Sequence, residues 1–305
     1  MLGLGYDGDL FILAFDHRGS FVKTFFGIEG TPTPQETQRI ADAKTAIFEG
    51  FLRAVEREGV DKAVAGVLVD EQFGADVARR ARQQSFILAM PAEKSGQNEF
   101  DFEYGDDFGQ HIEFNEPMFT KVLVRFNPEG DGATNARQAE RLKRLSDWLH
   151  RGERKFLFEL LVPAEPHQLE TLNGDAGRFD TEIRPNLMRR AIAQLQEAGI
   201  EPDIWKIEGL DQREDCETIA QQCRVAGRDH VACVVLGRGA DQGKVDEWLR
   251  AASGVPGYQG FAIGRSIWWE PLKAFVDGSM ARDAVSAQIG TNYARFVKVY
   301  RGQGA

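Results

Sequence analysis

The sequence has few cysteines, no long apolar run and no excess of basic residues. Three cysteines, an odd number, are too few for a disulfide framework, so the cytoplasm is the simplest compartment. No apolar stretch approaches the ~18 residues of a membrane span, and residues 1–9 lack the regions of a signal peptide. We therefore expect no membrane partner.

Negative charge outweighs positive charge, with 37 Lys and Arg against 47 Asp and Glu and a formal net charge of −10. This balance argues against a general surface for nucleic acid or for an anionic membrane. A local basic pocket in an acidic protein can still bind a small anion.

Histidines are also few, and none of the five forms an HxH or HExxH spacing. Motifs rich in metal ligands are therefore missing, and we expect neither a metal nor another cofactor. A zinc-dependent class II aldolase with dispersed ligands remains an alternative.

The remaining composition, 42% hydrophobic and 28% charged over 305 residues, is that of an ordinary globular protein. A typical domain size of ~150 residues suggests two domains, but α/β barrels often exceed 250 residues as one domain. No Gly/Ser/Pro-rich linker divides the chain, so we expect a single domain over 1–305.

Short apolar, β-rich runs alternate with polar segments of helical period. Several runs, such as FILAF and VACVVL, are apolar at nearly every position, which is typical of parallel strands covered on both faces. The eight expected strands are Leu10–Phe15, Ala63–Val69, Phe86–Met90, Lys121–Phe126, Lys155–Val162, Asp203–Ile207, His230–Leu236 and Gly260–Ile263. The clearest helices are Gln35–Glu58, Asn135–Leu149, Pro185–Ala198, Glu214–Arg224 and Lys244–Ala252. Eight βα units favour a (β/α)8 TIM barrel over a doubly wound open sheet, the second choice.

One segment, Ala92–Phe119, breaks this rhythm because it is acidic and aromatic and has no sustained helical period. We interpret it as a surface excursion with its aromatic side chains folded inward. The alternative is a lid over the barrel mouth or an oligomer contact, and a homo-oligomer is compatible with the sequence.

Two charged residues interrupt apolar strands: Glu159 lies within FLFELLVP and Lys206 within DIWKIEG. A buried charged group needs a partner or a shifted pKa. One interpretation is a purely structural ion pair between them. The other is a pocket shared with Lys121 and Asp16, in which desolvation and a second cation favour a neutral amine that attacks a carbonyl. These are the parts of a Schiff-base enzyme.

These four residues, on the first, fourth, fifth and sixth strands, resemble the site of class I aldolases of the tagatose-bisphosphate aldolase type. The segments EKSGQNEFDFEYGDDFG, FELLVP, WKIEG, VVLGRGA and GFAIGRSIWWEPL resemble more closely the aldolase domain of myo-inositol catabolism. That family cleaves 2-deoxy-5-keto-gluconate 6-phosphate into dihydroxyacetone phosphate and malonic semialdehyde. Its domain is often fused behind a sugar kinase, whereas we expect this sequence to be a stand-alone aldolase-like chain.

The resemblance implies a role for each of the four residues. Lys206 forms the iminium with the substrate ketone, and Glu159 is the acid/base for dehydration of the carbinolamine. Lys121 stays protonated, favours the neutral form of Lys206 and holds substrate hydroxyls. Asp16 orients the substrate or takes the proton from the hydroxyl at the cleaved bond.

A phosphate site is expected from barrel architecture itself, because the loops after strands seven and eight often bind phosphate. Those loops contain two Gly-Arg pairs, and their glycines allow backbone N–H groups to approach an anion. The expected phosphate ligands are Gly237, Arg238, Gly239, Gly264, Arg265 and Ser266. The candidates for holding a substrate carboxylate are Arg18, Lys94 and Arg125.

The expected partner is therefore a small phosphorylated sugar. Other readings are an aldolase for tagatose bisphosphate or another ketose phosphate, a metal-dependent aldolase, isomerase or epimerase barrel, and a non-catalytic phosphosugar-binding barrel. A buried amine beside a second lysine argues against the last, because a simple binder gains little from it.

Overall fold

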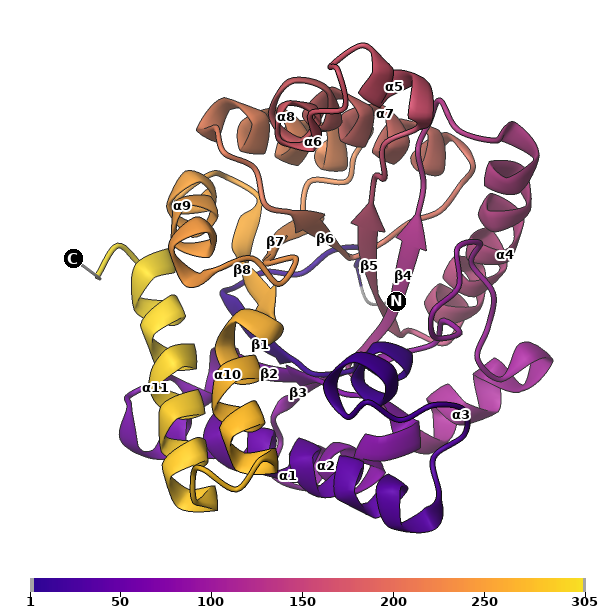
Figure 1. The fold of residues 1–305 in the computed structure, drawn as a ribbon. Helices are drawn as coiled ribbons and strands as arrows, with labels where there is room; N and C mark the ends of the chain where they lie inside the picture. The colour runs from indigo at the N-terminus through magenta and orange to yellow at the C-terminus, as the bar shows by residue number, and fades with distance from the viewer. Residues whose placement is uncertain (1–2, 304–305) are drawn as a thin grey trace.

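The computed structural model describes residues 3–303, and its eight parallel strands close into a barrel in sequence order. Figure 1 shows the ring of strands with the helices around it. The strands are β1 Leu10–Ala14, β2 Ala65–Leu68, β3 Ile87–Pro91, β4 Phe119–Arg125, β5 Lys155–Leu161, β6 Ile204–Glu208, β7 Ala232–Leu236 and β8 Tyr258–Ile263. The expected TIM barrel is confirmed, and the doubly wound sheet is wrong because β8 pairs with β1.

The longer helices alternate with the strands until α11, which follows α10, and the five predicted helices lie within three residues of their expected limits. They are α1 Pro34–Arg57, α2 Glu71–Gln83, α3 Phe108–Asn115, α4 Gly132–Arg151, α7 Arg184–Glu197, α8 Arg213–Arg224, α9 Gln242–Ala252, α10 Arg265–Val276 and α11 Arg282–Tyr300. The short pieces are η1 Phe21–Phe25, η2 Lys62–Val64, η3 Gly105–Asp107, α5 Pro166–Glu170, α6 Ala176–Arg178 and η4 Phe179–Ile183.

Helix α1 shows how local chemistry sets these limits. Thr33 accepts a hydrogen bond from the Glu36 N–H, and the Glu36 carboxylate accepts one from the Thr33 N–H, which is a capping box. Pro34 fills the first helical position, where its missing N–H costs nothing. Gly59 follows the helix with a φ of +77°, a conformation that glycine adopts without a Cβ clash.

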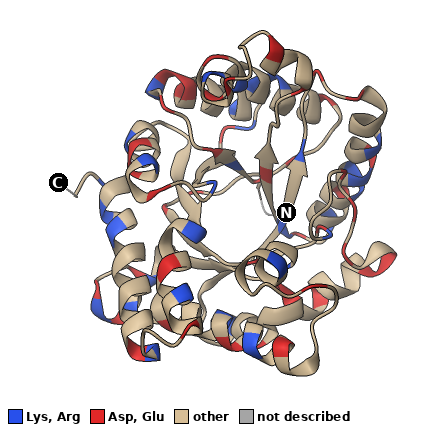
Figure 2. Cartoon of the chain, in the orientation of Figure 1, with Lys and Arg blue, Asp and Glu red and all other residues tan. Residues whose placement is uncertain are grey.

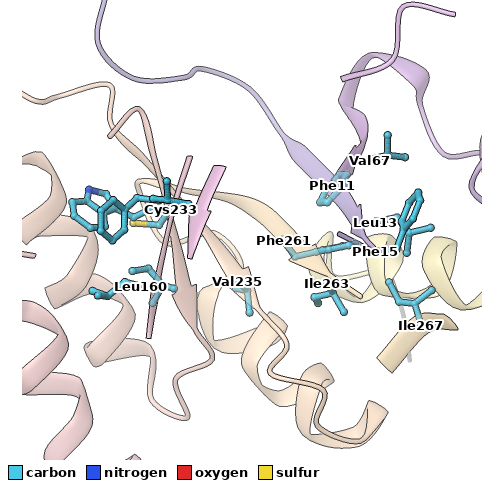
Figure 3. Close-up of a cluster of buried hydrophobic side chains, with 14 of the residues drawn as sticks. Phe11, Leu13, Phe15, Val67, Leu160, Cys233, Val235, Phe261, Ile263 and Ile267 are labelled. Atoms are coloured by element: carbon cyan, nitrogen blue, oxygen red, sulfur yellow. The ribbon is translucent and has the colours of Figure 1, made fainter. Parts of the chain in front are cut away.

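Two apolar layers support the barrel. The larger layer lies between the strands and the helices, and Figure 3 shows part of it, including side chains from β1, β7 and β8. The smaller layer fills the barrel interior with Leu10, Ile12, Ala14, Leu68, Ile87, Ala89, Phe119, Leu157, Ile204, Ala232, Val234 and Ala262. The barrel is therefore a packed core and not a pore, so polar side chains nearer the strand ends rest on an apolar floor.

Candidate active site

The alternation of side chains along β6 places Lys206 on the inner face of the barrel. On β6, Trp205 and Ile207 belong to the layer under the helices, whereas Ile204 belongs to the interior layer. Successive side chains of a strand point to opposite faces. Lys206 and Glu208 therefore follow Ile204 toward the carboxyl end of the barrel, where TIM-barrel active sites lie.

The same alternation brings Glu159 and Lys121 to this end. Leu157 of β5 belongs to the interior layer, and Glu159 lies two residues after it. Phe119 of β4 also belongs to that layer, and Lys121 lies two residues after it. In the sheet register, Glu159 stands opposite Lys206. Figure 2 shows basic positions in blue and acidic positions in red among the strands of the ring.

Glu159 lies between the two lysines. Its Oε2 accepts a hydrogen bond from Lys206 Nζ at 2.9 Å and lies 3.1 Å from Lys121 Nζ. All three side chains are almost completely buried, with exposures of 6% or less. One carboxylate oxygen therefore links the two ammonium groups that the sequence analysis places in one pocket.

Lys121 is the centre of a larger cluster. Its Nζ donates to Asp16 Oδ2 at 2.8 Å and to Glu93 Oε1 at 2.9 Å. Asp16 follows β1 and was expected here. Glu93 follows β3 and was not among the predicted site residues, although its neighbour Lys94 was.

The pKa values of the three carboxyl groups shift in different directions. Burial alone would raise the pKa of Asp16 and of Glu159, but the surrounding positive charges, chiefly those of Lys121 and Lys206, together outweigh it and lower both pKa values. Burial raises the pKa of Glu93, and Lys121 and Arg18 only partly oppose it. Burial would lower the pKa of Lys121, yet Asp16, Glu159 and Glu93 raise it above its usual value, which keeps Lys121 protonated.

A cavity of about 630 Å³ opens above this cluster. Its lining includes every predicted site residue except Ser266: Asp16, Arg18, Lys94, Lys121, Arg125, Glu159, Lys206, Gly237, Arg238, Gly239, Gly264 and Arg265. The volume is within the range of small-molecule sites. The barrel fold thus brings together residues from seven strands or the loops that follow them.

The predicted phosphate ligands form one side of this cavity. Arg265 is exposed at the start of α10, and its Nη2 donates to the Arg238 carbonyl at 2.8 Å. Gly239, with a φ of +76°, leaves room for this guanidinium, because a Cβ there would lie 2.6 Å from the Arg265 Cζ. The two expected loops therefore meet, and Arg265 remains without a carboxylate partner within residues 3–303.

Arg238 and Ser266 are engaged elsewhere. Arg238 lies 3.1 Å from Glu208 and donates to Asp180 at 2.7 Å. The Ser266 hydroxyl donates to the Ala240 carbonyl at 2.6 Å. Their phosphate-binding roles stay predictions, and a bound anion would compete with two carboxylates for Arg238.

The three carboxylate candidates also differ in availability. Arg18 donates to Glu103 at 2.9 Å and to the Glu93 carbonyl at 2.8 Å, and only 6% of its side chain is exposed. Lys94 and Arg125 line the cavity without a carboxylate partner in the described chain, and Arg125 donates only to the Gln97 carbonyl. Free cationic groups thus lie on the β3–β4 side as well as on the β7–β8 side.

The segment Ala92–Phe119 has features of both of its interpretations. Phe102 and Phe108 fold inward, since their rings stack at 4.3 Å and Phe108 lies 5.5 Å from Trp148 of α4, whereas Phe114 is 78% exposed. Its first residues, Glu93 to Gln97, line the cavity. The segment also contains helix α3, which its sequence does not predict.

A buried ion pair behind the site escaped the sequence analysis. Lys44 of α1 pairs with Asp70 and also donates to the carbonyls of Phe15 and His17, at 2.7 and 2.9 Å. These carbonyls flank Asp16 on both sides. A lysine inside an amphipathic helical pattern gives no signal of this role, because the pattern alone does not show which partner its ammonium reaches.

Several structural features bear on the other expectations. Among residues 3–303, no three His, Cys, Asp or Glu side chains are placed to hold a metal ion together. In the same range, no helix is both long and apolar enough to cross a lipid bilayer. Cys216, Cys223 and Cys233 are free and buried.

The fold and site define a (β/α)8 barrel with a buried lysine–carboxylate cluster at the carboxyl ends of its strands. The chain belongs to the family described as "Uncharacterized protein conserved in bacteria (DUF2090)", which matches residues 6–304. No curated protein sequence matches the chain.

Solved structures of the same fold cover nearly the whole chain at low sequence identity. One is Cgl0159 from Corynebacterium glutamicum, with a TM-score of 0.60 and 19% identity, covering 97% of this chain and 87% of that one. Another is fructose-bisphosphate aldolase from Plasmodium falciparum, with a TM-score of 0.65, 13% identity and coverages of 98% and 92%. A third is a Schiff base-forming fructose-1,6-bisphosphate aldolase, with a TM-score of 0.57, 14% identity and coverages of 96% and 94%. At these identities the similarity shows the shared fold.

The Lys44–Asp70 pair generates a testable prediction. Lys44→Met leaves a buried carboxylate without its cation, so the free energy of unfolding should fall by about 3–5 kcal/mol. Lys44→Met with Asp70→Asn removes both charges, and Asn still accepts the hydrogen bond that Asp70 takes from the Phe73 N–H at the start of α2. Urea unfolding should therefore show the double variant to be more stable than Lys44→Met. A double variant no more stable than the single one would contradict this account.

Proposed function

We propose that this protein is a class I aldolase that cleaves a phosphorylated keto sugar acid through a Schiff base on Lys206. One observation carries the proposal: the Lys206 amine lies in the cavity, 2.9 Å from the Glu159 carboxylate, with Lys121 next to the same oxygen. An amine that attacks a ketone needs a neighbouring group that accepts and returns protons. Glu159 occupies that place.

The first half of the proposed reaction forms the iminium. Lys206 transfers its ammonium proton to Glu159 and attacks the substrate ketone. Glu159 then returns a proton to the carbinolamine hydroxyl, which leaves as water. Lys121, kept protonated chiefly by the carboxylates of Asp16 and Glu159, supplies a fixed positive charge and N–H donors for substrate oxygens.

The second half breaks the carbon–carbon bond. Asp16, whose pKa is lowered beside Lys121, is ionised and accepts the proton of the substrate hydroxyl. The electron pair of the O–H bond forms the aldehyde C=O, and the electrons of the broken C–C bond enter the iminium to give an enamine. Protonation of the enamine carbon and hydrolysis then release the ketone fragment and free Lys206.

The unpaired cations support a substrate with an anionic group at each end. Arg265, with Gly239 and Gly264, is the proposed phosphate site, and Lys94 with Arg125 is the proposed site of the second anion. The proposed substrate, 2-deoxy-5-keto-gluconate 6-phosphate, carries a phosphate and a carboxylate, and its products are dihydroxyacetone phosphate and malonic semialdehyde. Tagatose bisphosphate and other ketose phosphates are the competing substrates. Two of the structural neighbours are fructose-bisphosphate aldolases, which supports the reaction class.

Replacing the proposed nucleophile tests the reaction class. Lys206→Met should reduce cleavage of the phosphorylated keto acid to the rate without enzyme, because the proposed reaction passes through an iminium on Lys206, while thermal unfolding stays cooperative. Lys143→Met, at an exposed position on α4, is the matched control and should keep wild-type turnover. Activity lost on chelation and restored by zinc would instead favour the metal-dependent alternative.

The phosphate site generates a separate prediction. Arg265→Ala removes a charge-assisted contact worth about 1.5–3 kcal/mol, so affinity for a phosphorylated substrate should fall roughly 10–150-fold. Most of this loss should appear in KM, because the phosphate is remote from the cleaved bond. The control is an unphosphorylated ketose, whose slow cleavage should barely change. Equal losses on both substrates would show that Arg265 has a structural role and that the phosphate binds elsewhere.

A further inference from the structure

Glu93 is the third carboxyl group on Lys121 and has no role in the reaction just described. It follows β3, lines the same cavity and is 5% exposed. Lys121 contacts Asp16, Glu93 and Glu159 at 2.8, 2.9 and 3.1 Å, so Glu93 belongs to the reacting cluster and not to its surroundings.

The two oxygens of Glu93 have very different environments. Its Oε1 accepts hydrogen bonds from Lys121 at 2.9 Å and from Arg18 at 3.3 Å. Its Oε2 is buried and has no hydrogen-bond partner among residues 3–303. An ionised oxygen left buried without a donor is costly, whereas a protonated one is neutral and becomes a donor itself.

The charges around the cluster favour the same protonation state. Burial raises the pKa of Glu93, and the negative charge of Asp16 adds to the effect, against Lys121 and Arg18. Asp16 and Glu159 have lowered pKa values. Of the three carboxyl groups, Glu93 is therefore the one whose surroundings most favour the protonated form.

We propose that Glu93 is a further catalytic residue, kept protonated, whose Oε2–H donates a hydrogen bond to the substrate oxygen at the carbon–carbon bond that breaks. This proposal rests on the proposed aldolase function. Asp16 and Glu93 share Lys121, so the base that takes the hydroxyl proton and the acid that stabilises the resulting alkoxide lie side by side. No proton leaves Glu93 in this step, since the hydroxyl proton goes to Asp16 and the alkoxide electrons form the aldehyde C=O. A carboxylic acid held neutral by its site is a known means of supplying such a donor.

The protonation state is tested by infrared spectroscopy on the full-length protein with 13C-labelled glutamate. Near neutral pH, the wild-type spectrum should contain a carboxylic-acid band that Glu93→Gln removes and that the matched variant Glu159→Gln keeps. The band should disappear as pH rises through the raised pKa of Glu93. A spectrum that Glu93→Gln leaves unchanged would overturn the proposal, whatever reaction the protein catalyses.

Kinetics test whether the proton acts as a donor. Glu93→Gln keeps a neutral side chain with an N–H donor, so its kcat should stay within about 10-fold of wild type. The kcat of Glu93→Ala should be about 10²–10³-fold lower than that of wild type, which is the usual effect of removing one such donor. In wild type, kcat/KM should fall at high pH as Glu93 ionises, and this fall should be absent in Glu93→Gln.

Two kinetic results would separate the possible failures. Equal losses in Glu93→Gln and Glu93→Ala, with the Lys206 adduct still forming, would show that Glu93 is an ionised counter-charge for Lys121 and would overturn the donor role alone. Absence of any Lys206 adduct would overturn the aldolase function itself. Circular dichroism and thermal unfolding of both variants show whether a loss of activity comes from misfolding. In that case, the pH titration of the carboxylic-acid band in the wild-type protein decides whether Glu93 is protonated.

Discussion

The charge of Lys121 is the constraint on which the rest of the site depends. A buried ammonium needs partners, and its contacts with Asp16, Glu93 and Glu159 match the three N–H donors it carries. These carboxyl groups lie at or near the carboxyl ends of β1, β3 and β5, so the Lys121 side chain on β4 connects three other strands of the barrel. Lys206 then takes its position through Glu159, which both lysines share.

Because the cluster is buried, its members do not behave as independent charges. The surrounding cations outweigh burial and lower the pKa of Asp16 and of Glu159, whereas at Glu93 burial outweighs Lys121 and Arg18 and the pKa is raised. The site can thus hold ionised bases and a neutral acid within a few ångströms of each other. Such a division of pKa values among neighbouring groups is typical of acid–base chemistry.

The barrel and the four central residues could be predicted from the sequence because strand periodicity determines them. Apolar runs on both faces indicate a parallel sheet, and a charged residue two positions after an interior apolar one must point the same way. Glu159 and Lys206 meet this condition directly. Their partners follow from barrel closure, which brings the carboxyl ends of all strands to one mouth.

The rest could not be predicted, because it depends on tertiary contacts with no local signal. Glu93 lies in a loop without periodicity, and its unpartnered oxygen is visible only once Lys121 and Arg18 are placed. Lys44 occupies an ordinary helical position, and only packing shows that it reaches the backbone around Asp16. Likewise, the sequence does not show that Arg18 is paired with a carboxylate whereas the other two candidates, Lys94 and Arg125, are not.

The central claim, that Lys206 forms a Schiff base, is tested most directly by trapping it. The protein is incubated with dihydroxyacetone phosphate, reduced with borohydride, weighed intact and mapped by peptide mass spectrometry. The account predicts one adduct per chain, located on Lys206. No adduct, or an adduct located on Lys121 or Lys94, would contradict it.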